Sequence, residues 1–289
     1  MASPREIRRR IRSVRNTAQI TRALEMVSAA KMRRAQERVR ASRPYAERLR
    51  TIIAGLAVAG ESVDVSQFPL LQQRPVNRVG VIIVTADRGQ AGAFNTNIIR
   101  RAVRFLQEAG HPAELVTVGR KGRDFFAKTD QHVIAEFTQL GDNPSLDSLR
   151  PIIGVATESF ARGDVDAVYL IYSKFINTLT QQPEALQLLP IEPPEEIPAD
   201  QAVADFIFEP DAQTVLQALL PRYVEIQVYQ AMLESLASEH SARMVAMRAA
   251  TDNARDFIEE LTLSLNKARQ AQITREVSEI AAGAAALGA

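Results

Sequence analysis

The stretch TADRGQAGAFNTN, residues 85–97, has the composition of a turn that could hold a phosphate. It lies between an apolar run and an amphipathic one, and backbone amides at a strand-to-helix turn can approach an anion where glycines leave room. It offers Gly89 and Gly92, and the spacing matches neither G-x-G-x-x-G nor G-x-x-x-x-G-K-[ST]. The pattern therefore favours a tight turn over a nucleotide site.

The other groups that could do chemistry are scattered. His111, His132 and His240 are too far apart in sequence to suggest a zinc site, and GRKGRD (119–124) is typical of a basic, solvated loop. With no cysteine there is no disulfide, thiolate ligand or thiol nucleophile. We find no Ser/His/Asp order, no HExxH and no informative carboxylate pair. The sequence predicts no catalytic residue, no metal site and no bound cofactor on this chain.

Charge is divided unevenly along the 289 residues. Residues 1–50 carry 15 basic against 4 acidic side chains (+11), and the remainder carries 20 against 30 (−10). The first segment is therefore expected to meet an acidic surface of phosphates, lipid headgroups or protein carboxylates. No apolar run reaches the ~18 residues of a membrane span, so any membrane association must be indirect.

The elements that would position these groups fall into three segments, 1–60, 75–209 and 211–289. In the middle segment, apolar runs rich in β-branched residues alternate with amphipathic ones, which predicts a Rossmann-like α/β domain with a largely parallel sheet. Strands are expected at 78–85, 113–119, 132–137, 166–175, 185–191 and 204–210, and helices at 95–110 and 145–164.

The N-terminal segment is expected to be helical over about 5–58. Ile7, Ile11, Val14 and Ala18 follow 4-3-4 spacing, and we expect the apolar stripe to continue through three further residues. Pro44 should break or kink this helix because it lacks an amide hydrogen. The continuation of the stripe is assigned to Ile20, Leu24 and Val27.

The C-terminal segment decides the architecture. From Arg222 to Ala282 it has neither proline nor glycine, and its 3.5-residue apolar period is typical of a coiled coil. Such a helix, kinked near Pro221, would be roughly 90 Å long and needs a partner helix. We therefore predict an antiparallel coiled coil of the two terminal helices, with the α/β domain inserted between them. The C-terminal seam is assigned to Leu233, Ala237, His240, Met244, Met247, Thr251, Ala254, Ile258, Leu261, Leu265 and Ala268.

Both ends of the chain resemble a known family. ITRALEMVSAAKMRRAQ (20–36) and ASRPYAERLR (41–50) are similar to the N-terminal helix of the γ subunit of F-type ATP synthases. SEHSARMVAMRAATDNA (238–254) and LNKARQAQITREVSEIAAGAAAL (265–287) are similar to its C-terminal helix. The likeness covers essentially the whole chain and is weaker in the middle, where Gln90 departs from the family's usual turn.

The resemblance implies a rotor shaft that couples proton-driven rotation of the c-ring to ATP synthesis. One copy would turn inside a hexamer of α and β subunits, which bind Mg-ATP and ADP, and its α/β domain would contact the c-ring and the ε subunit. The chain itself would bind no nucleotide and no nucleic acid. The complex would lie on the cytoplasmic face of the bacterial plasma membrane, with this chain as a peripheral component.

Roles for single residues follow from the resemblance alone. Arg269 and Gln270 match a polar catch that contacts a loop of β. Met26, Lys31 and Met32 match the part of the shaft that faces the hexamer. Phe208 and Glu209 match the foot on the c-ring, and Ile280 to Leu287 lie in a smooth, apolar bearing tip.

Two alternatives stay open at this point. The basic N-terminal segment could bind nucleic acid or an anionic membrane, although its arginines flank an apolar stripe and Tyr45 is the one aromatic residue among them. The α/β segment could instead belong to a nucleotide-dependent enzyme.

Overall fold

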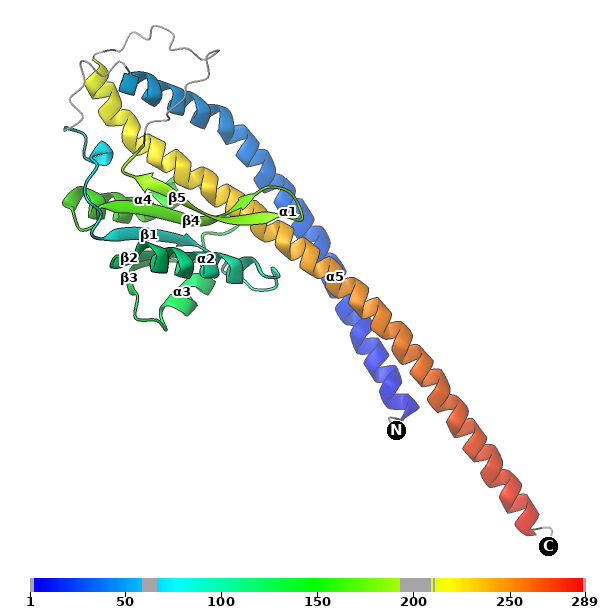
Figure 1. Cartoon of the computed structure of the whole chain (residues 1–289). Coiled ribbons are helices and arrows are strands. Elements are labelled where there is room, and N and C mark those ends of the chain that lie inside the picture. The colour runs from blue at the N-terminus through cyan, green and yellow to red at the C-terminus, as the bar shows by residue number, and fades with distance from the viewer. Residues whose placement is uncertain (1–2, 59–66, 193–208, 210, 288–289) are drawn as a thin grey trace. The chain divides into compact units, whose positions relative to one another are not determined.

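The computed structural model describes residues 3–58, 67–192, 209 and 211–287. Long helices stand at the two ends of the chain, and a sheet with shorter helices lies between them in sequence (Figure 1). In chain order the elements are α1 (Pro4–Val58), η3 (Pro69–Leu71), β1 (Val79–Val84), α2 (Phe94–Ala109), β2 (Ala113–Val118), α3 (Arg120–Phe126), β3 (His132–Phe137), α4 (Leu146–Arg162), β4 (Ala167–Phe175), β5 (Gln181–Leu189) and α5 (Ala212–Leu287).

Most strands and helices agree with the sequence-based prediction to within two residues at each end. Two assignments are corrected. Residues 119–124 are not a loop, because α3 begins at Arg120, and β5 begins at Gln181 instead of residue 185. The strand expected at 204–210 lies outside the described residues apart from Glu209.

The proline in α1 does not end the helix. Pro44 lies inside α1, and regular helix continues on both sides of it, so the break predicted there is wrong. A proline in a helix interior removes a backbone hydrogen bond and crowds the preceding turn, at a cost of about 3 kcal/mol. Leu49 and Ile53, which follow the proline, are buried, and their packing offsets that cost.

The sheet has the order β3-β2-β1-β4-β5. The pairs β3–β2, β2–β1 and β1–β4 are parallel, and β5 adds an antiparallel edge. All six residues of β1 are buried, as expected for a central strand covered on both faces. One face packs against α4 and parts of α1 and α5, and the other packs against α2 and α3.

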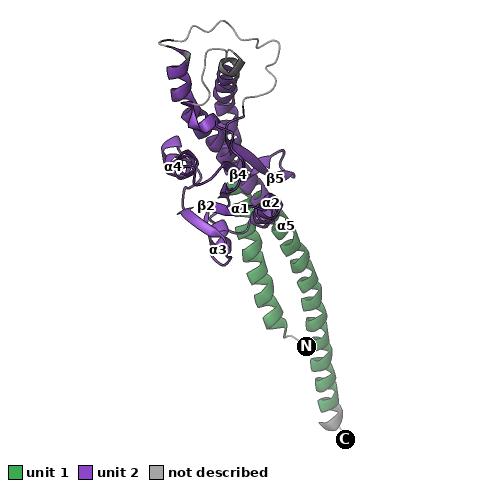
Figure 2. Ribbon diagram, turned by 60° about the vertical axis from the view of Figure 1, so that its left-hand side comes forward, with its two compact units in different colours: residues 1–28, 244–289 green, residues 29–243 purple. Residues whose placement is uncertain are grey.

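The chain forms two compact units (Figure 2). One comprises residues 1–28 and 244–289, which are the outer parts of α1 and α5. The other comprises residues 29–243, which include the sheet, its helices and the remaining parts of α1 and α5.

Candidate functional site: the two-helix seam and its surface

In the unit of residues 1–28 and 244–289, α1 and α5 pack along a heptad seam. Thr21 meets Thr251 and Glu25 meets Arg248, so positions rise along one helix as they fall along the other, and the pair is antiparallel. The predicted seam residues are all buried or half-buried: Ile7, Ile11, Val14, Met244, Met247, Ile258, Leu261 and Leu265. These eight residues therefore have the burial expected of a seam between the two helices.

The N-terminal arginines lie outside this seam. Arg5, Arg8, Arg9, Arg12 and Arg15 are all exposed, while the apolar residues between them face α5. The surface formed by these five arginines therefore remains free to meet a partner.

The seam continues through polar residues, which the sequence prediction missed. Thr21, Glu25 and Ser28 are buried, with 3 to 8% of their surface exposed. The predicted continuation is wrong, because Ile20 is 60% and Val27 50% exposed. A strict alternation of three- and four-residue intervals after Ala18 leads to Thr21, Glu25 and Ser28. The spacing, and not the apolar character of the residues, was therefore the signal that could have identified them.

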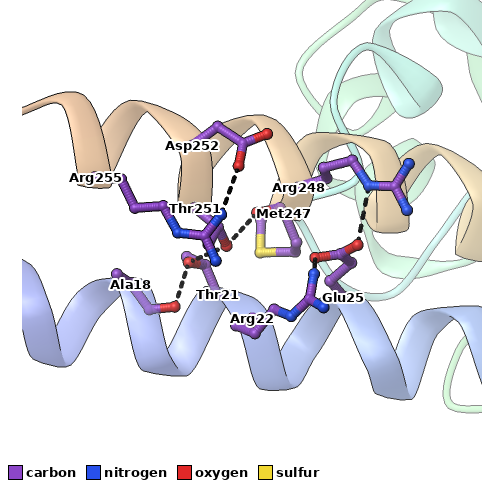
Figure 3. Close-up of polar contacts among 9 residues, drawn as sticks. All are labelled: Ala18, Thr21, Arg22, Glu25, Met247, Arg248, Thr251, Asp252 and Arg255. Atoms are coloured by element: carbon purple, nitrogen blue, oxygen red, sulfur yellow. Dashed lines mark hydrogen bonds and ion pairs between the residues drawn. The ribbon is translucent and has the colours of Figure 1, made fainter.

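A pair of threonine hydroxyls joins the helices in this polar layer (Figure 3). The Oγ1 atoms of Thr21 and Thr251 lie 2.7 Å apart. Thr21 Oγ1 is 3.1 Å from the carbonyl oxygen of Ala18, and Thr251 Oγ1 is 2.8 Å from that of Met247. Two hydroxyl hydrogens must serve three contacts, so one threonine donates to the other, which donates to its own helix.

A buried carboxylate completes the layer (Figure 3). Glu25 accepts hydrogen bonds from Arg248 Nε at 3.0 Å and from Arg22 Nη1 at 2.9 Å. Burial alone would raise the pKa of Glu25, but the hydrogen bonds and charges of the two arginines outweigh it and lower the pKa. Glu25 is therefore ionised at neutral pH and pairs across the two helices.

The three residues assigned to the hexamer-facing surface differ in exposure. Met26 is 58% exposed, in agreement with an outward position. Met32 is 6% exposed, so the outward position expected for its side chain is wrong; it continues the 4-3 stepping of the seam. Lys31 is half-buried and donates to Asp142 Oδ2 at 2.7 Å.

The seam of α5 ends before the helix does. Ala268 is the last half-buried residue, and residues 269–283 are all exposed. Arg269 and Gln270 thus lie on the open surface where the seam ends, and Ile280 is 73% exposed. Leu287 is the last residue of α5. The apolar residues of this stretch have no cover from α1.

The proposed foot is described only in part. Phe208 lies outside the described residues, and Glu209 is an exposed residue in a bend before α5.

Side chains of the turn at 85–97 accept hydrogen bonds from backbone amides within the turn and outside it. Asp87 accepts from the backbone amides of Arg120 and Gln139, and Asn95 accepts from that of Ala86. A carboxylate at the centre of the turn opposes an anionic ligand. Gly119 has a φ of 91°, and a Cβ there would collide with the carbonyl oxygen of Thr85. Gly119, which follows β2, thus permits the close approach of α3 to the end of β1.

Within the described ranges, no group of three or more His, Asp or Glu side chains is placed to hold a metal ion. The helices described here also include none with enough length and apolarity to cross a membrane.

The chain is of the class in which two antiparallel terminal helices form a coiled coil and an α/β domain is inserted between them in sequence. A family model described as ATP synthase matches residues 3–287. The "ATP synthase gamma chain" of Roseiflexus castenholzii is 56% identical over 99% of both chains, and that of Chloroflexus aurantiacus is 52% identical over 99% of both. The chain belongs to the γ-subunit family of bacterial F-type ATP synthases.

Solved structures share the fold at lower identity. The chain resembles one from the Euglena gracilis mitochondrial ATP synthase assembly of OSCP, F1 and c-ring, with a TM-score of 0.68 and 20% identity. The match covers 98% of this chain and 94% of that one. A chain from the central stalk and c-ring of the Tetrahymena thermophila enzyme gives a TM-score of 0.61 at 22% identity, covering 80% and 99%.

Proposed function

We propose that this chain is the central rotor shaft of a proton-translocating F-type ATP synthase. The two-helix coiled coil turns inside the hexamer of α and β subunits. The domain that contains the sheet connects the coiled coil to the c-ring. Each orientation of the asymmetric shaft has a different contact free energy with each β conformation. Rotation therefore shifts the β subunits in turn between binding, synthesis and release.

One observation carries this proposal. α5 extends past the end of its seam with α1 and there exposes Ile273, Val277 and Ile280 by 50, 60 and 73%. Their 4-3 spacing makes a stripe on one helix face, and an uncovered stripe of this kind normally marks an interface. A sleeve formed by other subunits would cover it.

The finer assignments are part of the same proposal. Arg269 and Gln270 form the catch, because an exposed guanidinium can hold a carboxylate of β at two points. Glu209, with Phe208, contacts the c-ring, and the α/β domain also binds the ε subunit. Catalysis and Mg-nucleotide binding belong to the partner subunits. The complex lies on the cytoplasmic face of the bacterial plasma membrane, to which this chain is attached through the c-ring.

Reconstitution tests the proposal. The α and β subunits and the membrane sector are assembled in liposomes with and without this chain, and ATP formation is measured after a proton gradient is imposed. We expect synthesis only when the chain is present, and none with either sample after an uncoupler is added. Gradient-driven synthesis without the chain would overturn the rotor assignment.

A further inference from the structure

A continuous line of polar contacts runs through the unit of residues 29–243. Lys31 on α1 donates to Asp142 Oδ2 at 2.7 Å, and His240 Nε2 on α5 lies 3.3 Å from Asp142 Oδ1. Arg243 Nη1 lies 3.4 Å from His240 Nδ1, and its Nη2 donates to the carbonyl oxygen of Gly89 at 3.2 Å. The line joins α1, the loop after β3, α5 and the turn after β1.

The protonation states fit this line at neutral pH. Burial lowers the pKa of His240 to about 4, although the charge of Asp142 opposes the shift. The neutral ring can then accept at Nδ1 from Arg243, while its Nε2 lies 3.3 Å from Asp142 Oδ1. Burial would raise the pKa of Asp142, but the hydrogen bond and charge of Lys31 outweigh it and lower that pKa.

Apolar packing holds a different part of the same unit. Leu49 and Ile53 on α1 and Leu220 and Val224 on α5 belong to the large core cluster against the sheet. Such packing is non-directional, and it holds these parts of α1 and α5 against the sheet. On α5, Ser238 and Ser241 donate to backbone carbonyls of the β4–β5 hairpin, which forms one edge of the sheet. β3 is the opposite edge strand.

Between its two attachments α1 passes a cavity. Lys31 and Leu49 are separated by 18 residues, or about 27 Å of helix. A cavity of about 560 Å³ lies along this stretch, lined by Val39, Arg43 and Ala46 of α1 and by Tyr172 and Leu186 of the sheet, among others.

We propose that Asp142 is a positioning residue that fixes the angle of the α/β domain about the two helices. It does so by tying the loop after β3 to α1 and α5 at once. The far edge of the sheet is then tied to both helices through Asp142, and the near edge is held by apolar packing and by the hydrogen bonds of Ser238 and Ser241. A rotor needs this angle fixed, because a domain that pivots on its shaft would absorb part of each rotary step.

The energetics make the proposal testable without unfolding the chain. The side chains of Lys31 and Asp142 are 35% and 53% exposed, and such a pair contributes about 0.2–1 kcal/mol. Removing the side chain of Asp142 should therefore leave the apolar core intact and widen only the range of angles that the α/β domain adopts about the two helices.

Spin labels measure the angle directly. The chain has no cysteine, so Arg34→Cys on α1 and Lys128→Cys after α3, both at exposed positions, take one label each. Electron–electron distances are recorded in the chain assembled with the α and β subunits. We expect Asp142→Ala to broaden the distance distribution by about twofold, as for a domain held at one edge only. Asp142→Asn, which can still accept from His240 but loses the ionic contact to Lys31, should broaden it less.

Asp124→Ala is the matched control, because Asp124 is an exposed carboxylate whose arginine partner, Arg123, lies beside it in α3. Its distribution should equal that of the unmodified chain. An unchanged distribution in Asp142→Ala, or equal broadening in the control, would overturn the proposal. Circular dichroism of each variant confirms that the helices are retained.

A second readout concerns coupling and rests on the rotor function proposed above. In vesicles, Asp142→Ala should lower the protons pumped per ATP hydrolysed by about twofold and leave the hydrolysis rate nearly unchanged. If the rotor assignment itself were wrong, the unmodified chain would support no pumping either. Broadened distances with unchanged coupling would show that the fixed angle has no part in rotation, and would overturn that part of the proposal.

Discussion

At the scale of the residue, Glu25 is the side chain that says most about how the seam between α1 and α5 is stabilised. Glu25 is 4% exposed, and its arginine partners Arg22 and Arg248 keep more than half of their side-chain surface in solvent. An ion pair with one buried and one hydrated member costs less desolvation than a fully buried pair. The layer can therefore remain charged without the usual penalty of burying both partners.

We expect Glu25→Gln to lower the free energy of unfolding by about 1 kcal/mol at pH 7, because hydrogen bonds to a charged group are replaced by weaker neutral ones. The comparison is made by thermal unfolding followed by circular dichroism. Glu6→Gln is the control, since Glu6 pairs with Arg10 on one exposed helix face. Equal destabilisation by the two substitutions would contradict a special role for Glu25.

The same substitution predicts a pH dependence. The folded pKa of Glu25 lies below its ordinary value of 4.5, so its contribution is fully present above pH 4.5 and is lost as the pH falls through the folded pKa. The stability difference between the unmodified chain and Glu25→Gln should therefore shrink below pH 4.5. A difference that stays constant to pH 3 would show that the charge of Glu25 is not its source.

At the scale of the element, the sequence predicted which segments are helices and strands better than which helix face is buried. The long heptad run of α5 and the buried strand β1 have unambiguous periods, and both were confirmed. The segment around residue 24 of α1 offers two stripes one residue apart. Apolarity favours Ile20 and Val27, whereas the structure buries Thr21 and Ser28. Choosing between them requires the opposite helix, whose Thr251 supplies the matching polar group.

The turn at 85–97 shows a second limit of prediction from sequence, which is that contacts between distant residues are not visible in it. Gly92, with a φ of 53°, agrees with the tight turn expected there, but Asp87 was not identified as the residue that joins the turn to the start of α3 and to the loop after β3. Those contacts connect residues 33 and 52 positions apart. Local pattern carries no information about such pairs, so the sequence could not supply them.

The threonine pair between α1 and α5 should show measurable coupling. Each single change, Thr21→Val or Thr251→Val, leaves one buried hydroxyl without its partner across the helices, whereas the double variant replaces both by apolar groups of equal shape. We expect a coupling free energy of about 0.5–1.5 kcal/mol in a double-mutant cycle, with the double variant near the unmodified chain in stability. Additive effects of the two changes would mean that the 2.7 Å contact contributes nothing.

At the scale of the whole molecule, the catch residues can be separated from the fold. Arg269 and Gln270 are exposed beyond the last half-buried seam residue, so Arg269→Ala with Gln270→Ala should leave thermal unfolding unchanged. Coupled ATP synthesis in the assembled enzyme should fall several-fold, because the contact to β is lost. Lys267→Ala with Asn266→Ala, also exposed and just before the catch, is the control. Unchanged synthesis in the catch variant would remove the role assigned to the pair.

The free end of α5 gives the sharpest division between folding and function. Residues 271–283 are all exposed, so removing them deletes little buried area and should not change the stability of the remaining chain. In the assembled enzyme the same residues would fill an apolar sleeve, where many weak contacts act together.

Deleting residues 284–289 should therefore lower coupled synthesis by less than about twofold, since few such contacts are lost. Deleting residues 271–289 should lower it several-fold. Both truncated chains are compared with the full chain by thermal unfolding and by gradient-driven synthesis in liposomes. If the longer deletion lowered the unfolding temperature as well, the end of α5 would be packing on its own chain; if synthesis survived it undiminished, no sleeve would surround that end.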